Sequence, residues 1–450
     1  MSELFDFLKY CLGAKSDVNK VIAGIDWQML YSFASKQAIL GLCFNGIERL
    51  GREYSDELKQ NPIERDLLMT WMGKAQQIRR QNMKVNTVAS KLFSMLREDG
   101  MRCCVLKGQG NALMYPNPYS RTPGDIDVWV NASREQITEY AKKHFEIGDD
   151  IRYHHLETSL DGVPVELHFF PCTMNNPIHN ARLQKWFKLN ADLQCSNVVC
   201  LPDGIGEIAI PTTAFNVVYQ LTHLYHHFFD EGIGMRQIID YFLVVNDFSK
   251  NVFLNNKSSK ITPSLFTLKE GSTSHPDPLT LRGEGGNRPT RCSEPLRSKD
   301  GGASKPSPNC AGWDRLSIEG DNSGGSATAV TSSASTALDV VQRELKYLGL
   351  WKFAGAVMYV LHEALGLSEE KMIAPMGEKR GKLLLAEILN GGNFGRHFTK
   401  YGNFTQQGMA KKYFLKIWRN MHFVRYYPAE ALSEPIFRTW HFFWRMKNKK

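Results

Sequence analysis

The sequence predicts an α+β fold in which a mixed β-sheet core lies between two helical units. Apolar residues recur at three- and four-residue spacing from residue 2 to about 98, which is typical of helices. Between 103 and 211 they form short β-type runs, and after 211 the helical spacing returns. A chain of 450 residues exceeds the size at which one core usually keeps growing, so we expect two or three structural units.

These changes of pattern place the expected boundaries. We predict an amino-terminal helical unit over 1–100 and an α/β core over 101–211. A carboxyl-terminal helical unit is predicted over 212–256 and 337–450. The stretch 257–336 between its two parts is rich in Ser, Gly, Pro, Thr and Asn. Its few apolar groups cannot offset the entropy of ordering, so we expect a disordered insert.

The composition of the chain indicates which class of protein it belongs to. Hydrophobic residues make up 42% and charged residues 22% of the chain, which is the balance of a globular protein. The net charge of +9 suggests an anionic ligand or surface. Nine scattered cysteines without a CxxC pair argue against a disulfide framework or a zinc site. Neither a secretory signal nor a transmembrane run is recognisable, so we expect a cytoplasmic protein without a transmembrane segment.

Three acidic residues are the candidate catalytic groups and metal ligands. In the run GDIDVWV, strand alternation places Asp125 and Asp127 on one face. Two carboxylates on one face repel each other unless a hard cation such as Mg²⁺, or Mn²⁺ in its place, lies between them. Glu166 in VPVELHFF is an acid in an apolar strand, which is costly unless it is paired or coordinated. It is therefore the candidate for a third acid in a two-metal site.

Positive groups for a phosphate occur beside these acids. Lys107 follows the apolar run that ends at Leu106, and Arg121 precedes the GDID run. Each could neutralise the β- and γ-phosphates of a nucleotide during phosphoryl transfer. Surface Lys and Arg are also the commonest solvated residues, so both assignments are hypotheses.

The order of these motifs resembles a known family. LKG, then YP, then R-x-x-GDID-x-x-V, then an acid before Leu-His resemble the uncharacterised nucleotidyltransferase family of the DNA polymerase β-type nucleotidyltransferase superfamily. The resemblance implies a polymerase β-type core in which Gly108 takes the turn that holds the triphosphate. It also implies that Asp125 and Asp127 bridge the metals and that Glu166 completes the site.

Taken together, these features predict a metal-dependent enzyme. It would transfer a nucleoside monophosphate from an NTP to a hydroxyl acceptor and release pyrophosphate. The acceptor could be a small molecule, a sugar, a protein side chain or a nucleic-acid end. The alternative is a catalytically degenerate fold that binds nucleotide or a partner protein, because fold does not fix function. A nucleic-acid-directed polymerase or toxin is a third possibility, although no zinc finger or RNP signature is present.

Several other polar groups are interpreted as structural. His154, His155 and His168 are expected to be hydrogen-bonded histidines of half-buried strands and are left out of the catalytic set. His223 and His227 lie one helical turn apart, but no further ligand accompanies them. Arg236 and Asp240, at the same spacing, are expected to form an intrahelical pair.

The carboxyl-terminal tail interleaves Lys and Arg with Trp, Tyr and Phe. It favours a helical cap with an apolar face on the core and a basic face in solvent. A contact with an anionic membrane or nucleic acid is the alternative interpretation.

Overall fold

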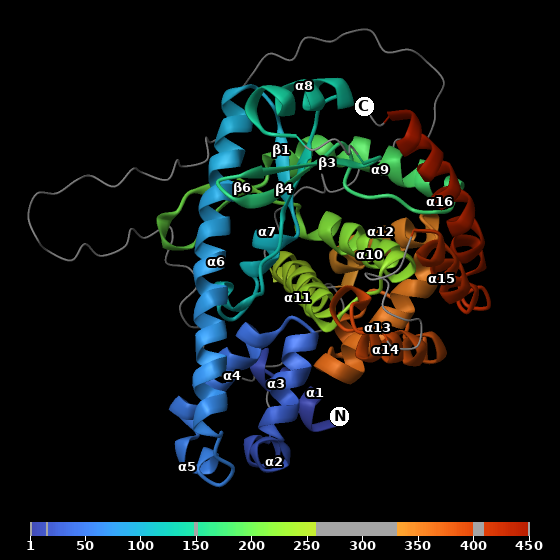
Figure 1. Cartoon of the computed structure of the whole chain (residues 1–450). Coiled ribbons are helices and arrows are strands. Elements are labelled where there is room, and N and C mark those ends of the chain that lie inside the picture. Colours follow the sequence, from blue (N-terminus) through green and yellow to red (C-terminus); the bar gives the residue numbers. More distant parts are fainter. Residues whose placement is uncertain (1, 15–16, 148–151, 258–330, 399–408, 449–450) are drawn as a thin grey trace, which may run out of the picture.

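The computed structural model describes residues 2–14, 17–147, 152–257, 331–398 and 409–448 (Figure 1). It confirms the predicted α+β class, in which a mixed sheet is embedded among helices. The central sheet has four strands in the order β1-β2-β4-β3. Strands β2 and β4 are parallel, and the other two neighbouring pairs are antiparallel. Its strands are β1 (Cys103–Leu106), β2 (Ile126–Val130), β3 (His155–Leu160) and β4 (Val163–His168).

A tight turn fixes the register of strands β3 and β4. The two residues between them, Asp161 and Gly162, have φ values of 50° and 72°. Two-residue hairpin turns need such positive φ values, which Asp and Gly tolerate best. The turn places His155 opposite His168 at the other end of the hairpin. A separate two-stranded sheet contains β5 (Val198–Cys200) and β6 (Glu207–Ala209).

Helix α6 (Arg65–Glu98) links the amino-terminal helices to the central sheet. It runs along one side of the molecule from those helices up to the strands (Figure 1). Near its start, the Trp71 indole donates a hydrogen bond of 2.9 Å to the Leu40 carbonyl. From Val85 to Leu96 its buried residues share one hydrophobic core with the strands. The preceding helices are α1 (Ser2–Cys11), α2 (Val18–Gly24), α3 (Trp27–Lys36), α4 (Leu40–Glu53) and α5 (Ser55–Leu58).

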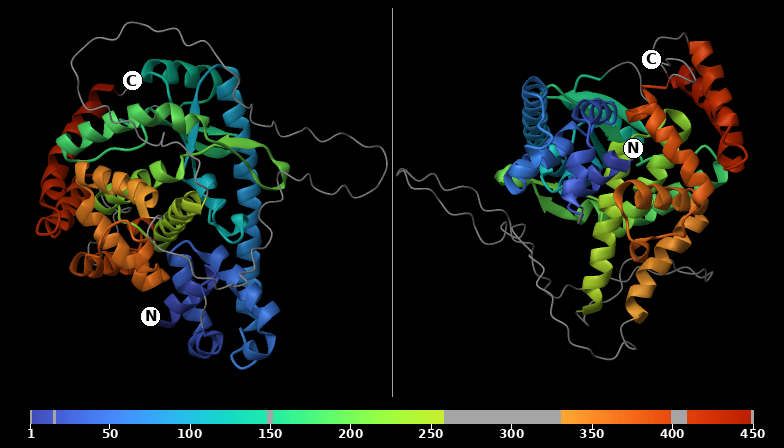
Figure 2. Two further views of the ribbon diagram at one scale, coloured as in Figure 1. Left: turned by 180° about the vertical axis from the view of Figure 1, so that it is seen from behind. Right: turned by 90° about the horizontal axis from the view of Figure 1, so that it is seen from below.

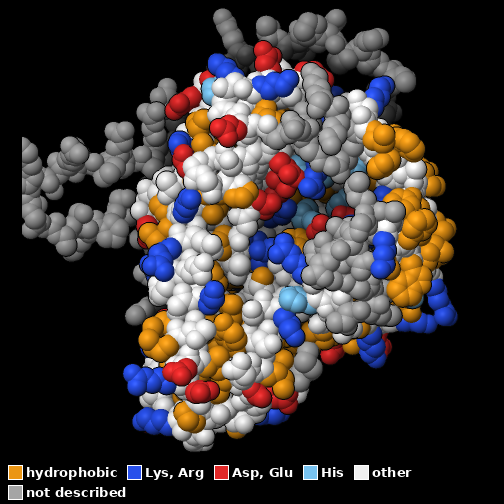
Figure 3. All heavy atoms as spheres, in the orientation of Figure 1, with side chains coloured by type: hydrophobic (Ala, Val, Ile, Leu, Met, Phe, Trp, Pro, Cys, Tyr) orange, Lys and Arg blue, Asp and Glu red, His pale blue; other side chains and the backbone are white. Residues whose placement is uncertain are grey.

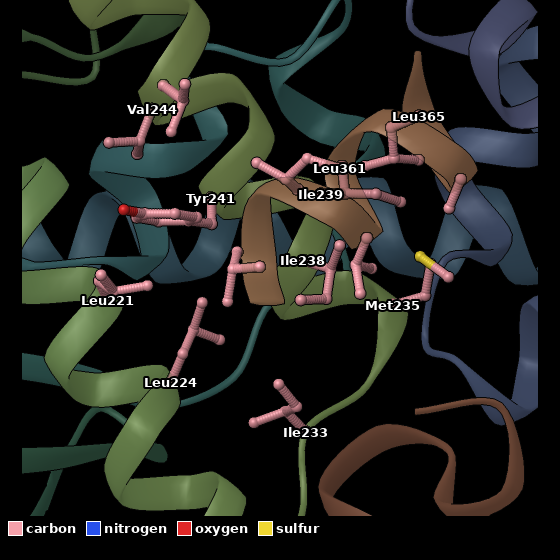
Figure 4. Close-up of a cluster of buried hydrophobic side chains, with 14 of the residues drawn as sticks. Leu221, Leu224, Ile233, Met235, Ile238, Ile239, Tyr241, Val244, Leu361 and Leu365 are labelled. Atoms are coloured by element: carbon pink, nitrogen blue, oxygen red, sulfur yellow. The ribbon is translucent and has the colours of Figure 1, made fainter. Parts of the chain in front are cut away.

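A second, larger core extends from the amino-terminal helices to the helices that follow the sheet. Figure 4 shows part of it, where side chains of α10 (Thr213–Asp230), α11 (Met235–Lys257) and α13 (Trp351–Leu365) meet. Helix α12 (Thr331–Tyr347) packs on α10, α11 and α13. Helices from both sides of residues 258–330 therefore contribute to one core. Residues 258–330 of the insert predicted over 257–336 lie outside the described residues, whereas its two ends are helical, because α11 extends to Lys257 and α12 begins at Thr331.

The remaining helices complete the fold (Figure 2). They are α7 (Gly108–Ala112), α8 (Arg134–His144), α9 (Pro177–Ser196), α14 (Glu378–Gly391), α15 (Met409–Met421) and α16 (Pro428–Asn448). Single 3-10 turns occur at Pro118–Ser120, Pro202–Gly204, Glu369–Lys371 and Asn393–Gly395. In the part of the chain that the structure describes, none of the helices combines the length and the apolar character needed to cross a bilayer.

Candidate functional site

The three predicted acids lie together at one edge of the central sheet. Asp127 in β2 is the direct neighbour of Glu166 in the parallel strand β4. Asp125 is the second residue before Asp127 and directly precedes β2. Carboxylate oxygens of the three residues all lie within 4.8 Å of one another. Asp127 is buried, Glu166 is partly buried and Asp125 is exposed, so the group opens to solvent on one side.

Lys107 joins this group from the end of β1. Its ammonium lies 3.0 Å from Oδ1 of Asp127 and 2.9 Å from Nε2 of His223. Its φ of 46° is unusual for a residue with a side chain, and such strain is often found at functional sites. Gly108 also has a φ of 46°, and a Cβ atom there would meet no atom closer than the Asp125 carbonyl oxygen at 3.9 Å. The backbone conformation, rather than the available space, therefore favours glycine at position 108.

The acids differ in their electrostatics because their surroundings differ. Repulsion by Asp127, together with burial, raises the pKa of Asp125 to about 6. Burial alone would raise the pKa of Asp127 as well, but the Lys107 ammonium and a hydrogen bond from His168 hold it well below its usual range. The ionised form of Asp125, on the solvent side of the group, is thus disfavoured by the charge of its neighbour. A cation bound there would relieve the repulsion.

His168 contacts two of the acids. Its Nε2 atom lies 3.1 Å from Oδ1 of Asp127 and 3.2 Å from Oε2 of Glu166. Burial would lower the pKa of this imidazole, but the hydrogen bonds to the two carboxylates raise it to about 9. His155 lies across the hairpin, with Nδ1 3.2 Å from Oε2 of Glu166. Burial and the neighbouring His168 lower the pKa of His155 to about 3.

His155 and His168 are hydrogen-bonded strand residues, as expected, and the structure adds that the candidate metal ligands are among their partners. His168 follows Glu166 by two residues, so strand alternation alone places both side chains on one face. That signal was available in the sequence. The contribution of His155 was not, because it depends on the pairing of β3 with β4.

Arg121 pairs with Asp240 of helix α11 rather than with the acids at the sheet edge. Its Nε atom donates to Oδ1 of Asp240 at 2.9 Å, and its Nη2 atom donates to Oδ2 at 2.8 Å. Both side chains are 6% exposed. The expected pairing of Asp240 with Arg236 is therefore wrong. Arg236 instead donates to the Thr122 carbonyl at 3.1 Å, because Asp240 faces the chain segment that leads into β2.

Helix α10 lies across the face of the sheet that carries the acids. Its Phe215 ring stacks on Trp129 of β2, with the ring centroids 6.0 Å apart. His223 and His227 follow at four-residue intervals on the same side of the helix, and their Nε2 atoms are 3.1 Å apart. This stacking explains how His223 reaches Lys107. In the space-filling view, acidic, basic and histidine side chains meet in a hollow on this face of the molecule (Figure 3).

The sequence is similar to a known protein family. The model of a family described as "Uncharacterised nucleotidyltransferase" matches residues 23–262, which is more than half of the chain. The match contains the whole central sheet, whereas helices α12 to α16 lie outside it. No protein of curated function matches the chain.

Among solved structures, the chain is similar to an antigenic nucleotidyltransferase-like protein from Paracoccidioides brasiliensis. The sequence identity is 17% over 36% of this chain and 75% of that chain, with a TM-score of 0.25.

Proposed function

The chain belongs to the uncharacterised nucleotidyltransferase family, and on this basis we propose that it is a metal-dependent transferase. It moves a nucleoside monophosphate from an NTP to a hydroxyl acceptor and releases pyrophosphate. The observation that carries this proposal is the group formed by Asp125, Asp127 and Glu166, whose carboxylate oxygens lie within 4.8 Å of one another. Nucleotidyl transfer needs such a group, because the acids hold the metal that binds the phosphates.

The donor set fits a hard divalent cation. Oxygen ligands from carboxylates are those that Mg²⁺ takes in nucleotide sites, and Mn²⁺ accepts the same ligands. The pKa of Asp125, raised to about 6 chiefly by repulsion from Asp127, indicates a local excess of negative charge that a cation would remove. We assign Asp125, Asp127 and Glu166 as the metal ligands. When bound, the metal supplies charge neutralisation at the phosphates and acidifies the acceptor hydroxyl.

Each residue of the group then has a separate task. Glu166 is partly buried beside the open side of the group, and we assign it to orient the acceptor hydroxyl and take its proton. The ammonium of Lys107, at 3.0 Å from Asp127, neutralises the β- and γ-phosphates, and the turn at Gly108 lies beside them. Arg121 is held by Asp240, so we propose that it fixes the segment leading to Asp125 rather than a phosphate.

One observation favours a catalytically degenerate binding module as the second candidate. Lys107 lies against Asp127 and already neutralises part of its charge. If the ammonium stays there when nucleotide is present, it competes with the metal for Asp127. The protein would then bind nucleotide without turnover.

The two candidates differ in pyrophosphate release. Wild-type protein is incubated with each α-phosphate-labelled NTP, Mg²⁺ or Mn²⁺ and cell extract, to find a labelled acceptor and the released pyrophosphate. With that acceptor, Glu166→Gln should lower turnover by roughly 10²-fold or more, the size of a general-base effect. The matched control is Asp192→Asn, because the Asp192 side chain is 74% exposed on α9 and contacts Arg102 and Asn131 rather than the acids. Turnover of Glu166→Gln equal to that of Asp192→Asn would remove Glu166 from the site. Nucleotide binding without any labelled acceptor would favour the binding module.

We further propose that the carboxyl-terminal helices contact an anionic membrane surface. Residues 409–450 contain ten Lys and Arg but two Asp and Glu, a difference of eight against a net charge of +9 for the whole chain. Large apolar side chains are exposed at helical spacing on α15 and α16, and they form a patch along the edge of the molecule (Figure 3). The stripes are Phe414, Trp418 and Met421 on α15, and Leu432, Ile436, Trp440, Phe443 and Met446 on α16. Apolar and aromatic side chains among basic residues are typical of helices that lie in a lipid interface.

A further inference from the structure

A second group of possible metal ligands shares Glu166 with the acidic group. It consists of His155 from β3 and of Glu166 and His168 from β4. The two histidines are direct partners in the antiparallel pairing of these strands. Glu166 precedes His168 by two residues, so the three side chains lie on one face of the sheet. Backbone pairing within a hairpin, rather than a loop, therefore positions all three donors.

The distances within this group suit a small metal ion. Nδ1 of His155 and Nε2 of His168 each lie 3.2 Å from Oε2 of Glu166. The three donor atoms all lie within 4.8 Å of one another. In a tetrahedral site with bonds of about 2.0–2.1 Å, neighbouring ligand atoms are separated by roughly 3.3–3.4 Å. Two of the three separations are thus close to those around a zinc-sized ion, and an ion here would replace the proton that Nε2 of His168 holds against Glu166 and Asp127.

The hydrogen bonding of His155 provides independent evidence. Its Nε2 atom faces Oε1 of Glu157 at 3.5 Å, and Glu157 is itself held by Arg152 at 2.7 Å. If the proton of the neutral imidazole is on Nε2 and faces Glu157, Nδ1 carries the lone pair. Among the described residues, this buried Nδ1 atom has no hydrogen-bond partner, although it lies 3.2 Å from the Glu166 carboxylate.

In that tautomer two electron-rich atoms face each other in a buried place, which is unfavourable unless a proton or a metal ion lies between them. Metal-binding histidines commonly donate their other ring N–H to a carboxylate, and Glu157 stands in that position.

We infer that His155, Glu166 and His168 form a second metal site that takes a transition-metal ion of the Zn²⁺ class. Two imidazoles and one carboxylate are ligands that Zn²⁺ accepts, whereas Mg²⁺ prefers oxygen ligands alone. Three protein ligands leave a fourth position for water. The inference adds a second metal ion to the proposed function. It rests on that function only because it treats Asp125 and Asp127 as ligands of a separate Mg²⁺ site. An ion here fixes Glu166 against β3 and so sets the orientation of the third acid.

The test uses Co²⁺ as a spectroscopic probe of the full-length, metal-free protein. A tetrahedral site gives Co²⁺ a strong visible absorption, and we expect wild-type protein to show it at one equivalent. His155→Gln and His168→Gln should each weaken Co²⁺ binding by at least tenfold. Glu157→Gln should weaken it by about tenfold, the lower end of the effect of losing a carboxylate that supports a histidine ligand. Zn²⁺ added to the Co²⁺ form should abolish the absorption, whereas Mg²⁺ should not.

Matched variants separate this site from the proposed Mg²⁺ site. His154→Gln alters the neighbour of His155 that belongs to neither ligand group, and it should bind Co²⁺ like wild type. Asp125→Asn should also keep the Co²⁺ absorption while losing Mg²⁺-dependent nucleotide binding. Wild-type protein without the absorption, or equal binding by His155→Gln and wild type, would overturn the inference. Loss of Co²⁺ by Asp125→Asn as complete as that by His155→Gln would also overturn it, because the two groups would then be one site. Near-ultraviolet circular dichroism confirms that each variant is folded.

Discussion

The carboxylate of Asp240 and the three carboxylates at the sheet edge have different sets of positive partners. Asp240 on α11 receives both arms of the Arg121 guanidinium and the Tyr115 hydroxyl, all within 2.9 Å. Each of its oxygens has a donor, and its pKa is held below the usual range by these partners although burial alone would raise it. This carboxylate is fully satisfied within the fold.

The acids at the sheet edge have fewer positive partners than their charges require. Three carboxylates meet there, and in the described part of the chain the positive groups in contact with them are Lys107 and His168. Asp125 remains without such a contact among the described residues, and its pKa is raised to about 6, first by Asp127 and then by burial. A satisfied carboxylate stabilises the fold, whereas an excess of carboxylates indicates a place for an external cation. Replacing an acid by its amide should therefore lower the stability of the protein at Asp240 but not at the sheet edge.

The largest effect on stability is expected when Asp240 is replaced. Asp240→Asn leaves the Arg121 guanidinium buried without a counter-charge, so the free energy of unfolding should fall by about 3–5 kcal/mol. Urea denaturation followed by circular dichroism measures this change. The exposed Asp192→Asn should stay within about 0.5 kcal/mol of wild type. An Asp240→Asn variant as stable as Asp192→Asn would show that Asp240 is not the structural acid we describe.

The opposite result is expected at the sheet edge. Asp125→Asn removes one of two mutually repelling charges, so at neutral pH the free energy of unfolding should be unchanged or slightly higher. Mg²⁺-dependent nucleotide binding should nevertheless weaken at least tenfold, or about 1.4 kcal/mol. Denaturation and calorimetry on the same preparation measure both quantities. A marked loss of stability would mean that Asp125 belongs with the structural carboxylates.

Glu430 at the start of α16 is another buried carboxylate, and in the described part of the chain no cation contacts it. It accepts hydrogen bonds from the backbone N–H groups of Asn175 and Asn176, and burial raises its pKa to about 7. The folded protein therefore binds a proton more tightly here than the unfolded chain does. This contribution to stability is complete below the unfolded pKa of 4.5 and is lost as the pH rises through about 7. Denaturation between pH 5 and pH 8 should show this loss in wild type and a flatter profile in Glu430→Gln. Equal slopes would exclude Glu430 as the source.

The smallest effect is expected at the carboxyl-terminal patch. Ile436 is 73% exposed and Phe443 is 62% exposed, so changing both to Ser should hardly alter stability. Partition onto vesicles of anionic phospholipid should fall several-fold, and vesicles of phosphatidylcholine should bind neither protein. Ile178→Ser, at a 61% exposed position on α9, is the matched control. If the double variant binds vesicles like wild type, or if wild type elutes as a dimer that the double variant disrupts, the patch serves another partner.

The sequence predicted the parts of this arrangement that depend on local pattern. Strand alternation gave the common face of Asp125 and Asp127, and the order of motifs gave the family, which the match over residues 23–262 confirms. The fold class followed from the change between helical and strand periodicity. The cytoplasmic location, the domain boundaries and the roles of the site residues remain predictions.

What the sequence could not provide depends on contacts between distant segments. The neighbourhood of Asp127 and Glu166 requires β2 and β4 to pair in parallel although 32 residues separate these strands. The partner of Arg121 lies 119 residues away on α11, where helix orientation rather than four-residue spacing decides which side chain Asp240 meets. His155 likewise approaches Glu166 only through the β3–β4 hairpin. Such pairings follow from packing of the whole chain.

The central claim is that Asp125 and Asp127 hold the metal of a bound nucleotide. The most direct measurement is calorimetric titration of each NTP with Mg²⁺ into wild-type protein and into the Asp125→Asn, Asp127→Asn double variant. We predict that wild type binds at least one NTP in a Mg²⁺-dependent manner and that the folded double variant shows no such binding. Unchanged Mg²⁺-dependent binding by the double variant would contradict the account.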